Sequence, residues 1–129
     1  MTFFEHRRLF AFTSISLRVY NEILRRGVYT MELRSAHNIN ALLQTQDNTI
    51  FITDRSKDDM KTGVRGIVAD IKGVSMMEHK TPERDELEIV EVRVQVEPRG
   101  LAKARQIIDH GVGRPLEIIV EEVVACAAS

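Results

Sequence analysis

The feature that most constrains the fold is a change in hydrophobic period at Gly27. Before this glycine, Ile15, Val19 and Ile23 recur at four-residue spacing, which predicts the apolar stripe of an amphipathic helix. Thr13-Ser14 offers an N-cap, because a hydroxyl can accept hydrogen bonds from the unpaired amides of a first helical turn. Gly27 can take the left-handed conformation that often ends a helix. The sequence therefore predicts one main helix that ends at Gly27.

From Val28 onward the period is two residues. Apolar and polar side chains alternate from Tyr29 to Arg34, and successive side chains of a strand point to opposite faces of its sheet. The pattern predicts a strand directly behind the helix. Thr30, Glu32 and Arg34 then form one polar row on a single face of this strand.

Apolar runs predict the other strands, and glycine and proline separate them. The runs are Leu9–Phe12, Thr49–Thr53, Ile67–Ile71, Leu87–Val96 and Leu116–Val124. The segment His37–Gln44 fits a short helix or a turn, and the polar segment Glu78–Glu86 is expected to be an exposed loop.

A shorter second helix is predicted after Pro98, which is expected to end the long strand before it. Leu101, Ala104, Ile107 and Ile108 follow at roughly helical spacing, and Gly111 would stop the helix.

The order of these elements predicts an α+β fold. A strand, a helix, several strands, a helix and a strand leave too few crossover helices for a doubly wound parallel sheet. A curled, mostly antiparallel sheet with a helix plugging or flanking it fits better. The 129 residues, of which 43% are hydrophobic, are expected to form one domain over residues 1–129 with a single core.

Composition narrows the classes of protein to consider. The net charge of −1 favours neither nucleic acid nor acidic ligands as a global partner. The single cysteine, Cys126, cannot form an internal disulfide and indicates a reducing compartment. No apolar segment has transmembrane length, so a cytoplasmic protein without a membrane partner is expected. The four histidines have no metal-ligand spacing, and neither a metal nor a cofactor is predicted.

The segment Gly27–Arg34 resembles a motif of the ASCH branch of the PUA-like superfamily. In that family a helix ends at glycine and a strand follows with the pattern Gly-x-Lys-Thr-x-Glu-x-Arg. Asp47 before the strand Thr49–Thr53, and Gly63-Val64-Arg65-Gly66 before a valine-rich strand, extend the similarity over about residues 9–72. The whole chain also resembles a group of small, uncharacterised archaeal proteins.

The resemblance implies a PUA-like, curled β-barrel that binds RNA or a modified nucleoside. The ligand would lie in a cleft between the first helix and the barrel, where Glu32 and Arg34 supply polar contacts beside Thr30. Arg65 and Arg26 are the expected phosphate partners.

The resemblance has one departure that bears on catalysis. The family's lysine is replaced by Tyr29, whose ordinary pKa of about 10 does not suit a base at neutral pH. An amidohydrolase acting on acylated nucleosides is the alternative, based on Thr30 and Glu32, but Tyr29 argues against an enzyme. No catalytic residue is therefore assigned.

Two structural alternatives compete with a binding site. Glu32 and Arg34 could form an ion pair on a solvated face, and the loop after the strand Thr49–Thr53 could neutralise its own charges. That loop holds Arg55, Lys57, Lys61 and Arg65 together with Asp54, Asp58 and Asp59. His37 is expected to be a surface loop side chain. Leu116–Val124 could mediate self-association into a homodimer.

Overall fold

The computed structural model describes residues 2–80 and 87–125, which form six strands, two α-helices and one 3₁₀ turn. The strands are β1 (Thr2–Phe12), β2 (Tyr29–Leu33), β3 (Thr49–Ile52), β4 (Arg65–Lys80), β5 (Leu87–Asp109) and β6 (Leu116–Ala125). The helices are α1 (Leu17–Arg26) and α2 (Ala36–Gln44), and the 3₁₀ turn η1 covers Lys57–Asp59. The expected α+β class is confirmed. Cys126 and residues 81–86 of the expected loop lie outside the described residues.

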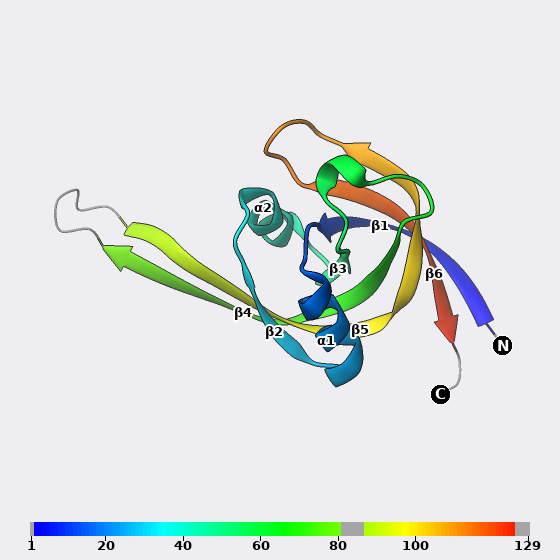
Figure 1. The fold of residues 1–129 in the computed structure, drawn as a ribbon, viewed down its shortest axis with the longest axis horizontal. Helices are drawn as coiled ribbons and strands as arrows, with labels where there is room; N and C mark the ends of the chain where they lie inside the picture. The colour runs from blue at the N-terminus through cyan, green and yellow to red at the C-terminus, as the bar shows by residue number, and fades with distance from the viewer. Residues whose placement is uncertain (1, 81–86, 126–129) are drawn as a thin grey trace.

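Five strands pair in a closed ring. β5 pairs with β4, β4 with β3, β3 with β1, β1 with β6, and β6 again with β5. Every pair is antiparallel except β1 with β3. β2 lies outside this ring and pairs only with β5, so its other edge has no strand neighbour among the described residues. Figure 1 shows β4 and β5 running beyond the ring as a two-stranded arm.

The two helices cover one side of the sheet and share its larger apolar core. Ile23 of α1 and Ala41 of α2 have no exposed surface, and both belong to a cluster that includes Met31 of β2 and Ile50 of β3. A second cluster lies around Phe51, whose side chain is also fully buried. Burial of apolar surface on both faces of β3 therefore ties the helices to the ring.

The helix predicted before Gly27 is confirmed, although it begins later than expected. Ser16, rather than Thr13-Ser14, is the N-cap, and its hydroxyl accepts a hydrogen bond from the Val19 amide at 3.2 Å. Gly27 has a φ of +83° and donates its amide to the Ile23 carbonyl oxygen at 3.0 Å. The sequence thus identified the C-terminal cap correctly.

The second helix predicted over Leu101–Ile108 is wrong. β5 continues through this segment, because Ala102 and Ala104 are buried while Leu101 and Lys103 are exposed. This alternation is typical of a strand with one buried face. A bulge between Ala104 and Gln106 then shifts the register and breaks this alternation before Ile107 and Ile108, so the spacing of the apolar residues imitates a helix. The shorter helix of the fold is instead α2.

Pro98 does not end the strand, as the sequence suggested. It pairs with Ala69 of β4, and the next pair along the ladder joins Gly100 to Val68, so Arg99 is an extra residue in β5. Proline cannot donate a hydrogen bond to a ladder, and a bulge beside it lets pairing resume. β5 can therefore be one continuous strand that belongs to both the ring and the two-stranded arm.

The strand predicted at Leu116–Val124 is confirmed as β6, but its apolar side chains face inward. Leu116, Ile118 and Val120 are buried in the second core cluster. Both edges of the strand are also hydrogen bonded over Glu117–Glu122, to β1 on one side and to β5 on the other. This part of β6 therefore offers no free edge for self-association.

Gly66 of β4 packs against β3 so closely that a larger side chain has no room. A Cβ atom there would lie 2.7 Å from the Ile52 carbonyl oxygen and would overlap the buried ring of Phe51. We expect Gly66→Ala to lower the free energy of unfolding by about 1–3 kcal/mol, because overpacking forces core atoms apart. Gly73→Ala is the control, since its Cβ would meet Gln95 only at 3.7 Å. Urea denaturation that gives equal values for both variants would contradict this account.

Candidate functional site

A cleft of about 630 Å³ lies between β2 and the connection from β1 to α1. Its lining residues are Thr13, Ser14, Ile15, Ser16, Arg18, Val19, Tyr29, Thr30, Met31, Glu32, Leu33, Arg34, Ser35 and Asn38. Consecutive residues from both faces of β2 line it, so the cleft runs along the unpaired edge of this strand. We call it the β2 cleft.

One wall of the β2 cleft is fixed by a pair of buried hydrogen bonds. The Thr13 amide donates to Asn38 Oδ1 at 2.9 Å, and Asn38 Nδ2 donates to the Thr13 carbonyl oxygen at 2.8 Å. Thr13 is 1% exposed and Asn38 is 5% exposed. The Asn38 side chain thus takes the place of a neighbouring strand for this one residue and attaches the β1–α1 connection to α2.

The polar row of β2 lies at the mouth of the cleft. Thr30, Glu32 and Arg34 are all exposed, and Arg34 Nη2 lies 3.5 Å from Glu32 Oε2. The solvated ion pair considered from the sequence is therefore present. Such exposed pairs contribute only about 0–1 kcal/mol, so a ligand could replace this contact at little cost.

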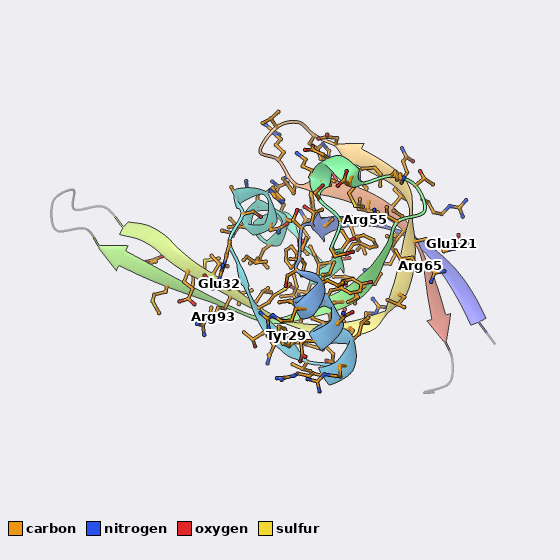
Figure 2. The ribbon with its side chains drawn as sticks, viewed as in Figure 1. Tyr29, Glu32, Arg55, Arg65, Arg93 and Glu121 are labelled. Carbon is orange, nitrogen blue, oxygen red and sulfur yellow. The ribbon has the colours of Figure 1, made fainter. Side chains whose placement is uncertain are left out.

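Tyr29 supplies an aromatic ring to the same cleft. Its side chain is partly buried, packs against the larger core cluster and lines the β2 cleft as well. Figure 2 shows Tyr29 and Glu32 at different points along β2. The cleft therefore combines an aromatic group, apolar side chains such as Val19, and a polar mouth.

The two other predicted site residues lie outside the β2 cleft. Arg26 Nε forms an ion pair with Glu22 Oε2 at 2.5 Å near the end of α1. Hydrogen bonding to Arg25, followed by the charges of Arg25 and Arg26, holds the pKa of Glu22 below its usual range. Arg65 lines a separate pocket near Tyr20. The structure thus gathers Thr30, Glu32 and Arg34 but not these two arginines.

Sequence reasoning missed two residues that shape the cleft. Arg18 lies in the first turn of α1 and lines the cleft as a second cation. Asn38 holds the wall from the buried side of α2. The available signal was the position of Asn38 three and four residues before Ala41 and Leu42, on the apolar face of the helix, because a buried amide needs hydrogen-bond partners.

His37 is partly buried in α2 rather than on a surface loop. Its Nε2 atom lies 2.9 Å from Thr13 Oγ1 and 3.4 Å from Ser35 Oγ. Burial lowers the pKa of His37, and the nearby charge of Lys57 lowers it further. A neutral imidazole can accept a hydrogen bond from the Thr13 hydroxyl, so His37 supports the same connection as Asn38.

Among the described residues, no helix is long and apolar enough to cross a membrane. The same residues contain no group of three or more His, Cys, Asp or Glu side chains placed to hold a metal ion.

These features define a small α+β protein with a ring-like sheet and a cleft at an unpaired strand edge. The chain belongs to the family described as a protein of unknown function, DUF473, whose profile matches residues 7–118. It is also similar to the uncharacterised protein MJ0105 of Methanocaldococcus jannaschii, with 25% identity over 97 residues. That match covers 74% of this chain and 64% of the relative, so the chain spans less than two thirds of the relative's length.

Asn38→Ala should lower the free energy of unfolding by about 2–4 kcal/mol, because it leaves the buried amide and carbonyl of Thr13 unpaired. Asn40→Ala is the matched control on the same helix, since its only described side-chain bond is a long one, 3.4 Å, to the Gly113 carbonyl oxygen. Chemical denaturation measures both values. A loss below about 0.5 kcal/mol for Asn38→Ala would show that the bridge does not hold the wall.

His37 should make the protein less stable in mild acid. Its pKa in the folded state lies below the value of about 6.5 in an unfolded chain, so the unfolded state takes up the proton first. The stabilisation is complete above that unfolded value and is lost as pH falls toward the folded pKa. We expect His37→Gln to flatten the pH dependence of the melting temperature between pH 7 and pH 5. Parallel curves for both proteins would contradict this assignment.

Proposed function

We propose that this protein is a binding module for RNA or a modified nucleoside, with one base held in the β2 cleft. One observation carries the proposal. Thr30, Glu32 and Arg34 line the mouth of a cleft of about 630 Å³ whose walls include Tyr29 and apolar side chains. Sites for small organic ligands have volumes of roughly 300–1,000 Å³.

The residues of the β2 cleft suit the groups of a nucleoside. Val19 offers apolar surface to a flat ring, and Tyr29 offers an aromatic face for stacking. The Glu32 carboxylate accepts hydrogen bonds from amino groups of a base, and the Arg34 guanidinium donates to carbonyl oxygens. The serine hydroxyls of the β1–α1 connection can bond the ribose.

The finer fold assignment belongs to the same proposal. A glycine-capped helix followed by the Thr30-x-Glu32-x-Arg34 strand resembles the ASCH branch of the PUA-like superfamily. The closed order of five strands is consistent with a PUA-like barrel. The single cysteine in 129 residues supports a reducing, cytoplasmic setting.

Hydrolysis is the less favoured activity, for a chemical reason. The described residues that line the cleft include one carboxylate, Glu32, and neither lysine nor histidine. A general base for amide hydrolysis would therefore have to be Glu32 itself, and this side chain is exposed and close to Arg34. Binding without catalysis fits these residues better.

The test is binding of the purified protein to tRNA, short RNAs and modified nucleosides at two salt concentrations. Arg34→Ala should weaken binding about tenfold, since a hydrogen bond to a charged group contributes roughly 1.5–3 kcal/mol. RNA affinity should also fall as salt increases. Arg114→Ala is the control, because Arg114 is exposed and outside the cleft, and has no ion-pair partner among the described residues.

Two results would contradict the proposal. The first is absence of binding to every RNA and nucleoside, and the second is equal binding by Arg34→Ala and Arg114→Ala. Turnover of acylated cytidines that Glu32→Gln abolishes would instead establish the amidohydrolase.

A further inference from the structure

A second pocket, of about 460 Å³, lies between α1 and the loop that leads into β4. Its lining residues are Tyr20, Asp54, Arg55, Lys61, Thr62, Gly63, Val64 and Arg65. We call it the loop pocket. It adjoins the β2 cleft, because the Ser14 amide at the edge of that cleft donates to the Arg55 carbonyl oxygen at 2.8 Å. Figure 2 shows Arg55 and Arg65 away from the β4–β5 arm.

The cations of the loop pocket have no ion-pair partner in the part of the chain that the structure describes. Arg55, Lys61 and Arg65 have no carboxylate within ion-pair distance among the described residues. Lys57 of the same loop differs, since its Nζ lies 3.6 Å from Asp109 Oδ1 and donates to the Gly111 carbonyl oxygen at 2.7 Å. Among the described residues, the ion pairs within the loop that the sequence allowed are therefore absent for these three cations.

The ladder beside the loop pocket adds another positive charge. Arg65 of β4 is directly opposite Lys103 of β5, and both side chains are exposed. Like charges placed opposite each other in a sheet are destabilising. Glu121 is the next residue across in β6, but its carboxylate binds Arg105 at 2.9 Å. An anion in the loop pocket would relieve this repulsion.

The charges of the loop pocket match a phosphate monoester. Three cations and one carboxylate, Asp54, line it, which leaves a net charge of +2, while a phosphate monoester carries about −1.5 to −2 at pH 7. Burial raises the pKa of Tyr20, Asp54 raises it further, and Arg65 lowers it. The Tyr20 phenol thus stays protonated close to both charges and can donate a hydrogen bond.

We propose that the loop pocket binds a phosphate group, held by the Arg55 and Arg65 guanidiniums, the Lys61 ammonium and the Tyr20 hydroxyl. Guanidinium groups bind phosphate oxygens in pairs, and an ammonium adds a point charge. This site goes beyond the proposed function, because binding of a base in the β2 cleft does not require it.

The first experiment is an NMR titration of the full chain with inorganic phosphate at constant ionic strength. Backbone amide signals of residues 61–65 should shift and saturate. Arg65→Ala should weaken phosphate binding about tenfold. Asp54→Asn should strengthen it, because Asp54 is the only acidic group that lines the pocket among the residues that the structure describes. Arg114→Ala should leave binding unchanged.

The opposite responses of Arg65→Ala and Asp54→Asn separate a phosphate site from simple loss of structure. A damaged fold would weaken binding in both variants, whereas an electrostatic site predicts opposite signs. Absence of saturable shifts at residues 61–65 would overturn the inference. Equal binding by Arg65→Ala and Arg114→Ala would overturn it as well.

A second experiment distinguishes the sources of the phosphate. Matched oligoribonucleotides with a 5′-phosphate or a 5′-hydroxyl end are compared with inorganic phosphate. If the protein prefers the strand with a 5′-phosphate and Arg65→Ala loses this preference, the bound phosphate is the end of an RNA. If both strands bind equally while inorganic phosphate still binds, the natural ligand is a free phosphorylated molecule. RNA binding that needs Arg34, together with no saturable binding of inorganic phosphate, would refute this inference alone. Phosphate binding without any RNA or nucleoside binding would refute the proposed function alone.

Discussion

The two hydrogen bonds between the Asn38 side chain and the Thr13 backbone decide where the β2 cleft can form. Thr13 is the first residue after β1, where the chain leaves the sheet and turns toward α1. Its buried amide and carbonyl would be costly without partners, and Asn38 satisfies both. The connection that leads into α1 is then held beside β2, and the space between this connection and β2 is the cleft. The neighbouring Thr13–His37 contact supports the same junction.

The double use of β5 explains why the cleft lies at an unpaired edge. One part of β5 closes the ring with β6, and the other part pairs with β4 on one side and β2 on the other. Bulges let β5 change direction between these two parts, because an extra residue bends a strand and increases its twist. β2 is therefore added to the ring from outside, and its second edge faces the β1–α1 connection.

Local patterns in the sequence were sufficient for α1, β2 and the polar row, since each depends on periodicity within a few residues. The segment Leu101–Ile108 was misassigned because a bulge, set by contacts with β6, breaks the alternation that identifies a strand. The partners of Asn38 are 25 residues away in the chain. The grouping of Arg55 with Arg65 depends on how the loop folds over α1, which periodicity does not encode.

The unpaired edge of β2 also limits which substitutions the residues of the cleft can accept. A free strand edge is open to pairing with other chains, and charged side chains beside it discourage such contacts. Glu32 and Arg34 therefore protect the molecule from aggregation as well as lining the cleft. Replacement of the polar row by apolar residues, to suit a more apolar ligand, would remove that protection. Protection of this edge therefore favours polar side chains at the mouth of the cleft.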